Sequence, residues 1–257
     1  MYAFDPQFYL VASATLFLIA LMKGASGGGL AVIGVPVLSL FIPPLQAAAV
    51  LAPLVCLMDV FAMMAYPPRT WNAGHLKLLI PGTLVGMAVG TLLIGRAPGW
   101  LVGPLIGLIA VVFAGQWLLR RVGLLRTGAG AAPGPVAGYV WGGVSGFTSL
   151  LAHAGGPPLA VYILPQNLPK TELAGTQTVY FTVVNYAKIV PYMLLGQFDG
   201  PTLLAAALLS PSIPLGVWIG RRLHGRLDQD LIYIVSYTLV FLTGCKMLLD
   251  AGRHLAG

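Results

Sequence analysis

Residues 81–96 read PGTLVGMAVGTLLIGR, and residues 211–226 read PSIPLGVWIGRRLHGR. One proline, three glycines and one arginine recur in these two stretches in the same order, 130 positions apart. Five matches at one offset are hard to obtain by chance, even in a chain with 33 glycines, and they indicate an internal duplication. We therefore predict two repeats, residues 1–122 and 136–257, joined by the Gly- and Pro-rich linker 123–135.

The composition places both repeats in a membrane. Of the 257 residues, 58% are hydrophobic and only 8% are charged, whereas a soluble domain carries about 25% charged residues. This excludes a cytosolic enzyme, a secreted domain and a nucleic-acid-binding protein, so the net charge of +7 indicates basic cytoplasmic loops. Cys56 and Cys245 lie in apolar runs, and no nucleotide-binding motif is present, so we expect no catalytic residue, no metal and no cofactor.

A helix needs about 20 mostly apolar residues to cross a bilayer. Seven stretches meet or approach this length, two of them with one charged residue inside: 8–22, 46–66, 78–95, 97–119, 173–195, 200–220 and 231–245. Residues 30–42 and 158–164 are too short and are expected to be half-helices of broken or re-entrant segments. The sequence thus predicts an all-α integral membrane protein with 8–10 membrane segments.

The basic residues favour repeats of inverted orientation. Five segments per inverted half place nine Lys and Arg residues on one side and three on the other, whereas parallel halves give seven and five. Cytoplasmic loops collect Lys and Arg, so the more uneven division is preferred. It places residues 120–135 in the cytoplasm and both termini in the periplasm of a bacterial inner membrane.

Charged residues inside apolar segments are the first candidates for a functional site. A Lys or Asp at the centre of a membrane helix costs about 2.5–3.5 kcal/mol on insertion scales and marks a functional hypothesis by default. Lys188 lies about two turns before the helix end expected near Gly196, with Asn185 on the same face and Gln177 roughly on that side. We expect Lys188 to face a polar cavity; the alternative is that its ammonium reaches the membrane surface. Asp59 is either a structural partner of a buried Lys or a proton carrier.

Two glycine runs precede the short segments. Lys23 comes before the first run and His153 before the second, and an ammonium beside the positive end of a helix favours an anion. Two such helix starts meeting near the midplane are expected of a secondary transporter for an anionic substrate. The alternatives are that the glycines only allow close packing and that His153 is an ordinary core histidine. The residues expected to bind the anion are Lys23, Ser26, Gly27, Gly28, Gly29, His153, Gly155, Gly156, Gln177, Asn185 and Lys188.

Together these features resemble the sulfite exporter TauE/SafE family over about residues 8–249. The resemblance rests on segments 24–36 and 146–158, the basic linker, the pair Asn185 and Lys188, and the repeated proline–glycine–arginine pattern. It implies a secondary transporter of small sulfur-containing anions such as sulfite, thiosulfate or organosulfonates, usually directed outward. The partners it implies are a small anion and the lipid bilayer, without nucleic acid; a homodimer stays open. The family varies more where this chain has His153, so that residue is not assumed to be shared.

Two other functions compete with this interpretation. Residues 24–27 match the Gly-x-Ser-Gly pattern of intramembrane serine proteases, with Ser26 as nucleophile and His153 as base. Residues 143–146 match the same pattern, which shows how easily it arises in a Gly-rich chain, and a protease needs no duplication. A passive anion channel would share the charged cavity, but its flux would not saturate or depend on a coupling ion.

Overall fold

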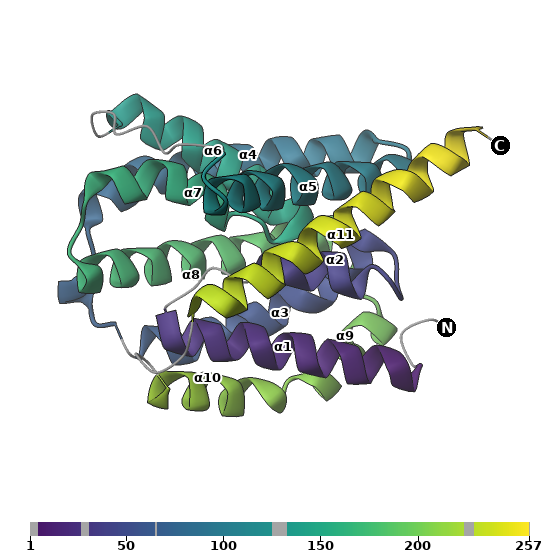
Figure 1. Cartoon of the computed structure of the whole chain (residues 1–257), viewed down its shortest axis with the longest axis horizontal. Coiled ribbons are helices and arrows are strands. Elements are labelled where there is room, and N and C mark those ends of the chain that lie inside the picture. Colours follow the sequence, from purple (N-terminus) through teal and green to yellow (C-terminus); the bar gives the residue numbers. More distant parts are fainter. Residues whose placement is uncertain (1–4, 27–30, 65, 125–132, 224–228, 257) are drawn as a thin grey trace.

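The computed structural model of the chain is helical, as the sequence predicts. It describes residues 5–26, 31–64, 66–124, 133–223 and 229–256, and within these ranges it contains no β-strand. Figure 1 shows most of the long helices running back and forth along one common direction, so the molecule is a bundle.

The first half of the chain alternates long helices with short helical segments. Proline at the first position starts two of the long helices, where its missing N–H leaves no bond unmade. Asn72 caps the next one by accepting a hydrogen bond from the backbone N–H of His75. The elements are α1 (Pro6–Ser26), η2 (Ala31–Ile33), α2 (Gly34–Leu38), α3 (Pro44–Met63), η3 (Pro68–Thr70), α4 (Ala73–Arg96), η4 (Gly99–Leu101) and α5 (Val102–Arg121).

The second half follows a similar order. Its elements are α6 (Pro135–Ala152), α7 (Gly156–Ile163), η5 (Leu164–Gln166), α8 (Lys170–Leu194), α9 (Gly200–Leu209), α10 (Ser212–Arg222) and α11 (Gln229–Ala256). The helix predicted over residues 200–220 is interrupted between α9 and α10, because Pro211 and Pro214 cannot donate to the preceding turn. The search for apolar runs missed α6, although this helix contains no Asp, Glu, Lys or Arg.

The short segments are helical and too short to span a bilayer, as predicted. α2 has five residues and α7 has eight. In the part of the chain that the structure describes, five helices are long and apolar enough to cross a membrane: Pro6–Ala25, Pro44–Met63, Ala73–Arg96, Gly99–Arg121 and Gly200–Arg222, the last combining α9 and α10. The chain is therefore a multi-pass membrane protein.

Glycines bring two helix pairs into backbone contact. A Cβ on Gly86 of α4 would lie 1.9 Å from the carbonyl oxygen of Gly143 on α6. A Cβ on Gly220 of α10 would lie 2.0 Å from the carbonyl oxygen of Leu21 on α1. No side chain fits at either place, and each glycine belongs to a Gly-x3-Gly spacing (Gly82 with Gly86, Gly216 with Gly220) of the kind that lets helix backbones approach closely.

Each of the main helix pairs joins one helix of the first half to one of the second. α1 packs on α10, α4 on α6, α3 on α8, and α5 on α11. In Figure 1, α1 begins and α11 ends at the right end of the bundle, whereas α8 begins and α10 ends at the left. Two inverted copies of one unit would interleave in this way, although the duplication and the side of the membrane stay predictions.

Candidate functional site

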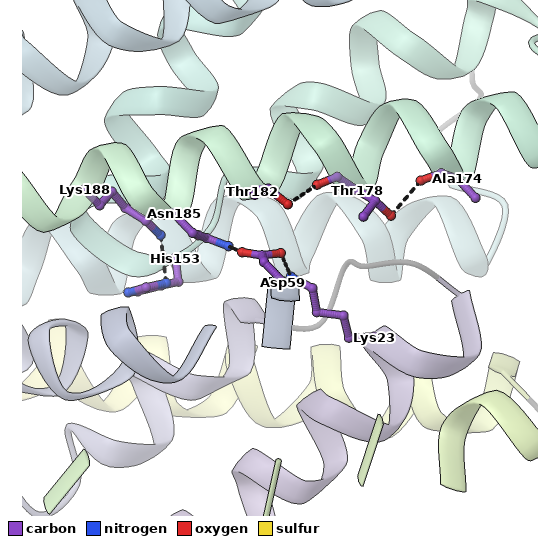
Figure 2. Close-up of polar contacts among 8 residues, drawn as sticks. All are labelled: Lys23, Asp59, His153, Ala174, Thr178, Thr182, Asn185 and Lys188. Atoms are coloured by element: carbon purple, nitrogen blue, oxygen red, sulfur yellow. Dashed lines mark hydrogen bonds and ion pairs between the residues drawn. The ribbon is translucent and has the colours of Figure 1, made fainter. Parts of the chain in front are cut away.

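Asp59 sits at the centre of the bundle, where α3 packs against α8. Its side chain is fully buried. Lys23, near the end of α1, forms an ion pair with Oδ1, and the Asn185 side-chain amide donates to Oδ2 at 2.6 Å (Figure 2). Both carboxylate oxygens are thus engaged, and the charge of Lys23 is neutralised inside the protein.

Lys188 lies one turn after Asn185 on α8 and makes a different set of contacts. Its Nζ lies 2.9 Å from His153 Nδ1 (Figure 2). It also donates to the carbonyl oxygen of Ser149 at 3.4 Å. The Lys188 side chain is fully buried, so the alternative in which it reaches the membrane surface is wrong. Its contacts place it inside the bundle, as predicted for a residue facing a polar site.

The contact of His153 Nε2 indicates which atom donates in the hydrogen bond between Lys188 and His153. His153 Nε2 lies 3.0 Å from the carbonyl oxygen of Ala48 on α3, and a carbonyl can only accept. Nε2 therefore carries a proton, and with the ring neutral Nδ1 is the acceptor. Lys188 donates to Nδ1, so its positive charge rests against neutral groups only.

His153 adopts an unusual backbone conformation. It ends α6 with φ 51° and ψ 26°, in the left-handed region that non-glycine residues seldom occupy. Such a conformation costs about 1–3 kcal/mol and persists only where the surroundings impose it. Here the ring is held by Ala48 and Lys188 and stacks on Tyr192 at a centroid distance of 6.5 Å. The chain turns sharply at His153, and its ring points into the bundle.

The two groups of polar side chains line one small cavity of about 30 Å³. That volume has room for about one or two water molecules. With Lys188 protonated and His153 neutral, the charges of Lys23, Asp59 and Lys188 add to +1. The lining residues are Ile19, Lys23, Ala31, Val55, Met58, Ser149, His153, Gly156, Phe181, Asn185 and Lys188.

The structure brings together most of the predicted site residues that it describes. Asp59 has the Lys partner expected of a structural role. Gln177 is half-buried on α8 and does not line the cavity. Gly27, Gly28, Gly29 and the side chain of Ser26 lie outside the described residues, so the first glycine run contributes no geometry here.

The second glycine run supplies fewer donors than the sequence suggests. α7 begins at Gly156, and the next two residues, Pro157 and Pro158, have no N–H. Only Gly155 and Gly156 could offer backbone N–H groups at this turn. A Cβ on Gly155 would lie 2.9 Å from Ser145 Oγ, so close packing by itself accounts for this glycine. On this side of the cavity, side chains are the main polar groups.

Sequence reasoning missed several lining residues. Ser149 contributes its carbonyl oxygen, and its position one turn before His153 on α6 was an available signal. Met58 and Phe181 form part of the apolar wall, and no motif distinguishes them from other core residues.

The side chain of Ser26, the nucleophile expected for a protease, lies outside the described residues. The hydroxyl of Ser145, in the second Gly-x-Ser-Gly match, is buried and donates to the carbonyl oxygen of Gly155 at 2.7 Å. That bond connects α6 to the start of α7. Among the described residues, no three His, Cys, Asp or Glu side chains gather where they could hold a metal ion.

Comparison with protein families gives one match. The family model described as sulfite exporter TauE/SafE matches residues 12–247, which is nearly the whole chain. No curated protein and no solved structure matches the chain.

Proposed function

The chain belongs to the sulfite exporter TauE/SafE family, a family of membrane transporters, and we propose that it binds its anion beside Lys188 in the central cavity. The observation that carries this proposal is the buried ammonium of Lys188, whose contacts are a neutral imidazole and a carbonyl oxygen. A charge without a counter-ion is costly inside a membrane protein, so the arriving anion supplies the missing negative charge.

Asp59 prevents Lys23 from attracting the anion as Lys188 does. It neutralises Lys23 and orients the Asn185 amide, one turn before Lys188. A second unpaired ammonium would hold a divalent anion too tightly to release it. We propose that Lys188 binds the anion directly, with Asn185 and Gly156 beside it, and that Lys23 and Asp59 position the site.

The dimensions of the cavity support a compact substrate. A volume of about 30 Å³ accommodates one or two waters, and an oxyanion such as sulfite needs only a modest expansion beyond that. An organosulfonate must also place its carbon group against Phe181 and Met58. We therefore propose sulfite-sized oxyanions as the preferred substrates.

Export is the direction that we propose. A cytoplasm at negative potential favours outward movement of an anion by about 2.3 kcal/mol per charge and per 100 mV. The membrane potential alone can therefore drive export of a monovalent anion through this site.

His153 is the proton acceptor that the geometry supports best. In the structure its Nδ1 accepts from Lys188. When Lys188 turns its protons toward an anion, Nδ1 can take up one proton from water and return it when the anion leaves. The other charged group that lines the cavity is Lys23, and it is already paired with the buried Asp59 behind it. Asp59 has no free oxygen for a transported proton, so we propose that Asp59 is structural.

The test is sulfite flux into and out of proteoliposomes. We expect Lys188→Met to lower the flux at least a hundredfold while the protein still folds, because removing a charge that has no counter-ion leaves no other charge unpaired. The control is Lys246→Met, which removes an exposed Lys that pairs with the exposed Asp250. Wild-type flux in Lys188→Met would remove Lys188 from the site. Flux that rises linearly without saturation would indicate a channel.

A further inference from the structure

A second and larger hollow lies on the outside of the bundle, away from the anion site. It is a groove of about 890 Å³ between the end of α3 and the whole length of α10. Phe61, Pro214, Leu215 and Trp218 are among the apolar residues that line it, and Leu215 and Trp218 are about half exposed. α10 turns its glycine face toward α1, and in Figure 1 it lies at the lower edge of the bundle.

Two arginines line the groove at the end of α10. Arg221 and Arg222 are both exposed, and the guanidinium of Arg222 lies 3.7 Å above the ring of Trp218. A guanidinium over an aromatic face is held in place while its N–H groups stay available at the edge. No carboxylate is among the described residues of this groove. The groove is therefore apolar along its length and cationic at one end.

The length of the groove matches one leaflet of a bilayer. α10 has 11 residues and, at 1.5 Å per residue, is about 16 Å long, which is about half of a hydrocarbon core of about 30 Å. The groove begins at Pro211, at the break after α9, and ends at the arginines. Trp218 lies one turn inside that end, in the zone where tryptophan is enriched in membrane proteins.

Tyr66 adds a neutral polar group close to the arginines. Its side chain is half-buried in the connection after α3. Burial raises the pKa of its hydroxyl, and the nearby charge of Arg221 only partly offsets that effect. The hydroxyl keeps its proton at neutral pH and can donate to an anionic group bound at Arg221.

We propose that this groove binds an anionic phospholipid, with an acyl chain along α10 and the phosphate at Arg221 and Arg222. Basic pockets between membrane helices recognise anionic lipid headgroups in this way. The lipid would cover the exposed faces of Leu215 and Trp218 and bridge α3 to α10. The site is independent of the anion proposed beside Lys188, because none of its lining residues lines that cavity.

Native mass spectrometry of the purified, delipidated protein tests the proposal. The probes are phosphatidylglycerol and phosphatidylcholine with identical acyl chains. We expect phosphatidylglycerol to bind more tightly, and the double variant Arg221→Gln with Arg222→Gln to weaken it about thirtyfold, since each basic group near an anionic surface contributes about fivefold. The matched control is Arg120→Gln with Arg121→Gln, a pair of arginines at the end of α5. It should bind as the wild type does.

A second variant tests binding of the acyl chain separately from binding of the phosphate by the arginines. Leu215→Trp fills the groove without touching the arginines and should also lose the lipid, with helicity and monodispersity unchanged. The proposal would be overturned if the two lipids bound with equal affinity, or if the control variant lost as much lipid affinity as the Arg221 and Arg222 variant. Displacement of the lipid by millimolar inorganic phosphate would overturn it too. Conversion of a dimer to a monomer by Leu215→Trp, with lipid binding intact, would show that a second copy occupies the groove.

Discussion

The two sides of the central cavity carry similar residues in reversed roles. His153 follows Lys23 by 130 residues and Lys188 follows Asp59 by 129, so each side joins the end of one helix (α1 or α6) to the middle of another (α3 or α8). On the first side a Lys from the helix end meets a carboxylate and the charges cancel. On the second side the Lys lies mid-helix and meets a neutral histidine, so its charge remains. From this difference we infer that the first side holds the site together, and the second is the side where we propose that the substrate binds.

The largest expected effect comes from breaking the paired side. We expect Asp59→Asn to destabilise the protein by about 3–5 kcal/mol, because it leaves the ammonium of Lys23 buried without a counter-ion. Thermal unfolding in detergent would measure this. The double variant Lys23→Met with Asp59→Asn should recover most of the loss, since it removes both charges. Equal stability of the single variant and the wild type would contradict a structural ion pair.

A smaller effect is expected from altering the unpaired side without removing its charge. In His153→Gln the side-chain carbonyl can still accept from Lys188, but the residue cannot take up a proton. We expect sulfite transport to persist within about tenfold and to lose the part of its pH dependence that comes from protonation of His153. Proteoliposome flux against pH measures it. A pH profile identical to that of the wild type would exclude His153 as the proton acceptor.

The smallest effects concern the caps of α4 and α9. Asn72 caps α4 and Asp199 caps α9, each by accepting from a backbone N–H three residues later. Replacing either with Ala should cost about 1 kcal/mol, measured as a lower midpoint of thermal unfolding. The Asn72 amide also donates to Glu172 Oε1 at 2.7 Å, so Asn72→Ala should cost somewhat more than Asp199→Ala at neutral pH.

Acidification should separate these two caps. Hydrogen bonds from the Thr202 hydroxyl and backbone lower the pKa of Asp199, so its contribution is present above pH 4 and is lost as the pH falls through its lowered value. Asn72 does not titrate and keeps its contribution. Once the pH has fallen below the lowered pKa of Asp199, we expect Asp199→Ala to approach the wild type in stability, while Asn72→Ala stays less stable. Identical pH behaviour of the two variants would contradict this.

The sequence predicted the class of fold and which residues lie near the cavity. It predicted less well which of those residues contact one another. Apolar runs located most of the long helices, and the cost of a charge in a membrane marked Lys188 and Asp59. The bond between Lys188 and His153 joins residues on separate helices, and only the packing of α6 on α8 could reveal it. The break at Pro211 escaped notice because hydropathy does not register a missing N–H donor.

The backbone contacts at Gly86 and Gly220 also decide which parts of the bundle can move. At both places a carbonyl group of one helix lies directly against the Cα of a glycine on the other, so no side chain between them can repack. We therefore expect α4 with α6, and α1 with α10, to move as two rigid pairs. If the cavity opens in turn to the two faces of the membrane, we expect one rigid pair to tilt relative to the other. A few ångströms of tilt between α3 and α8 would pull Asn185 away from Asp59.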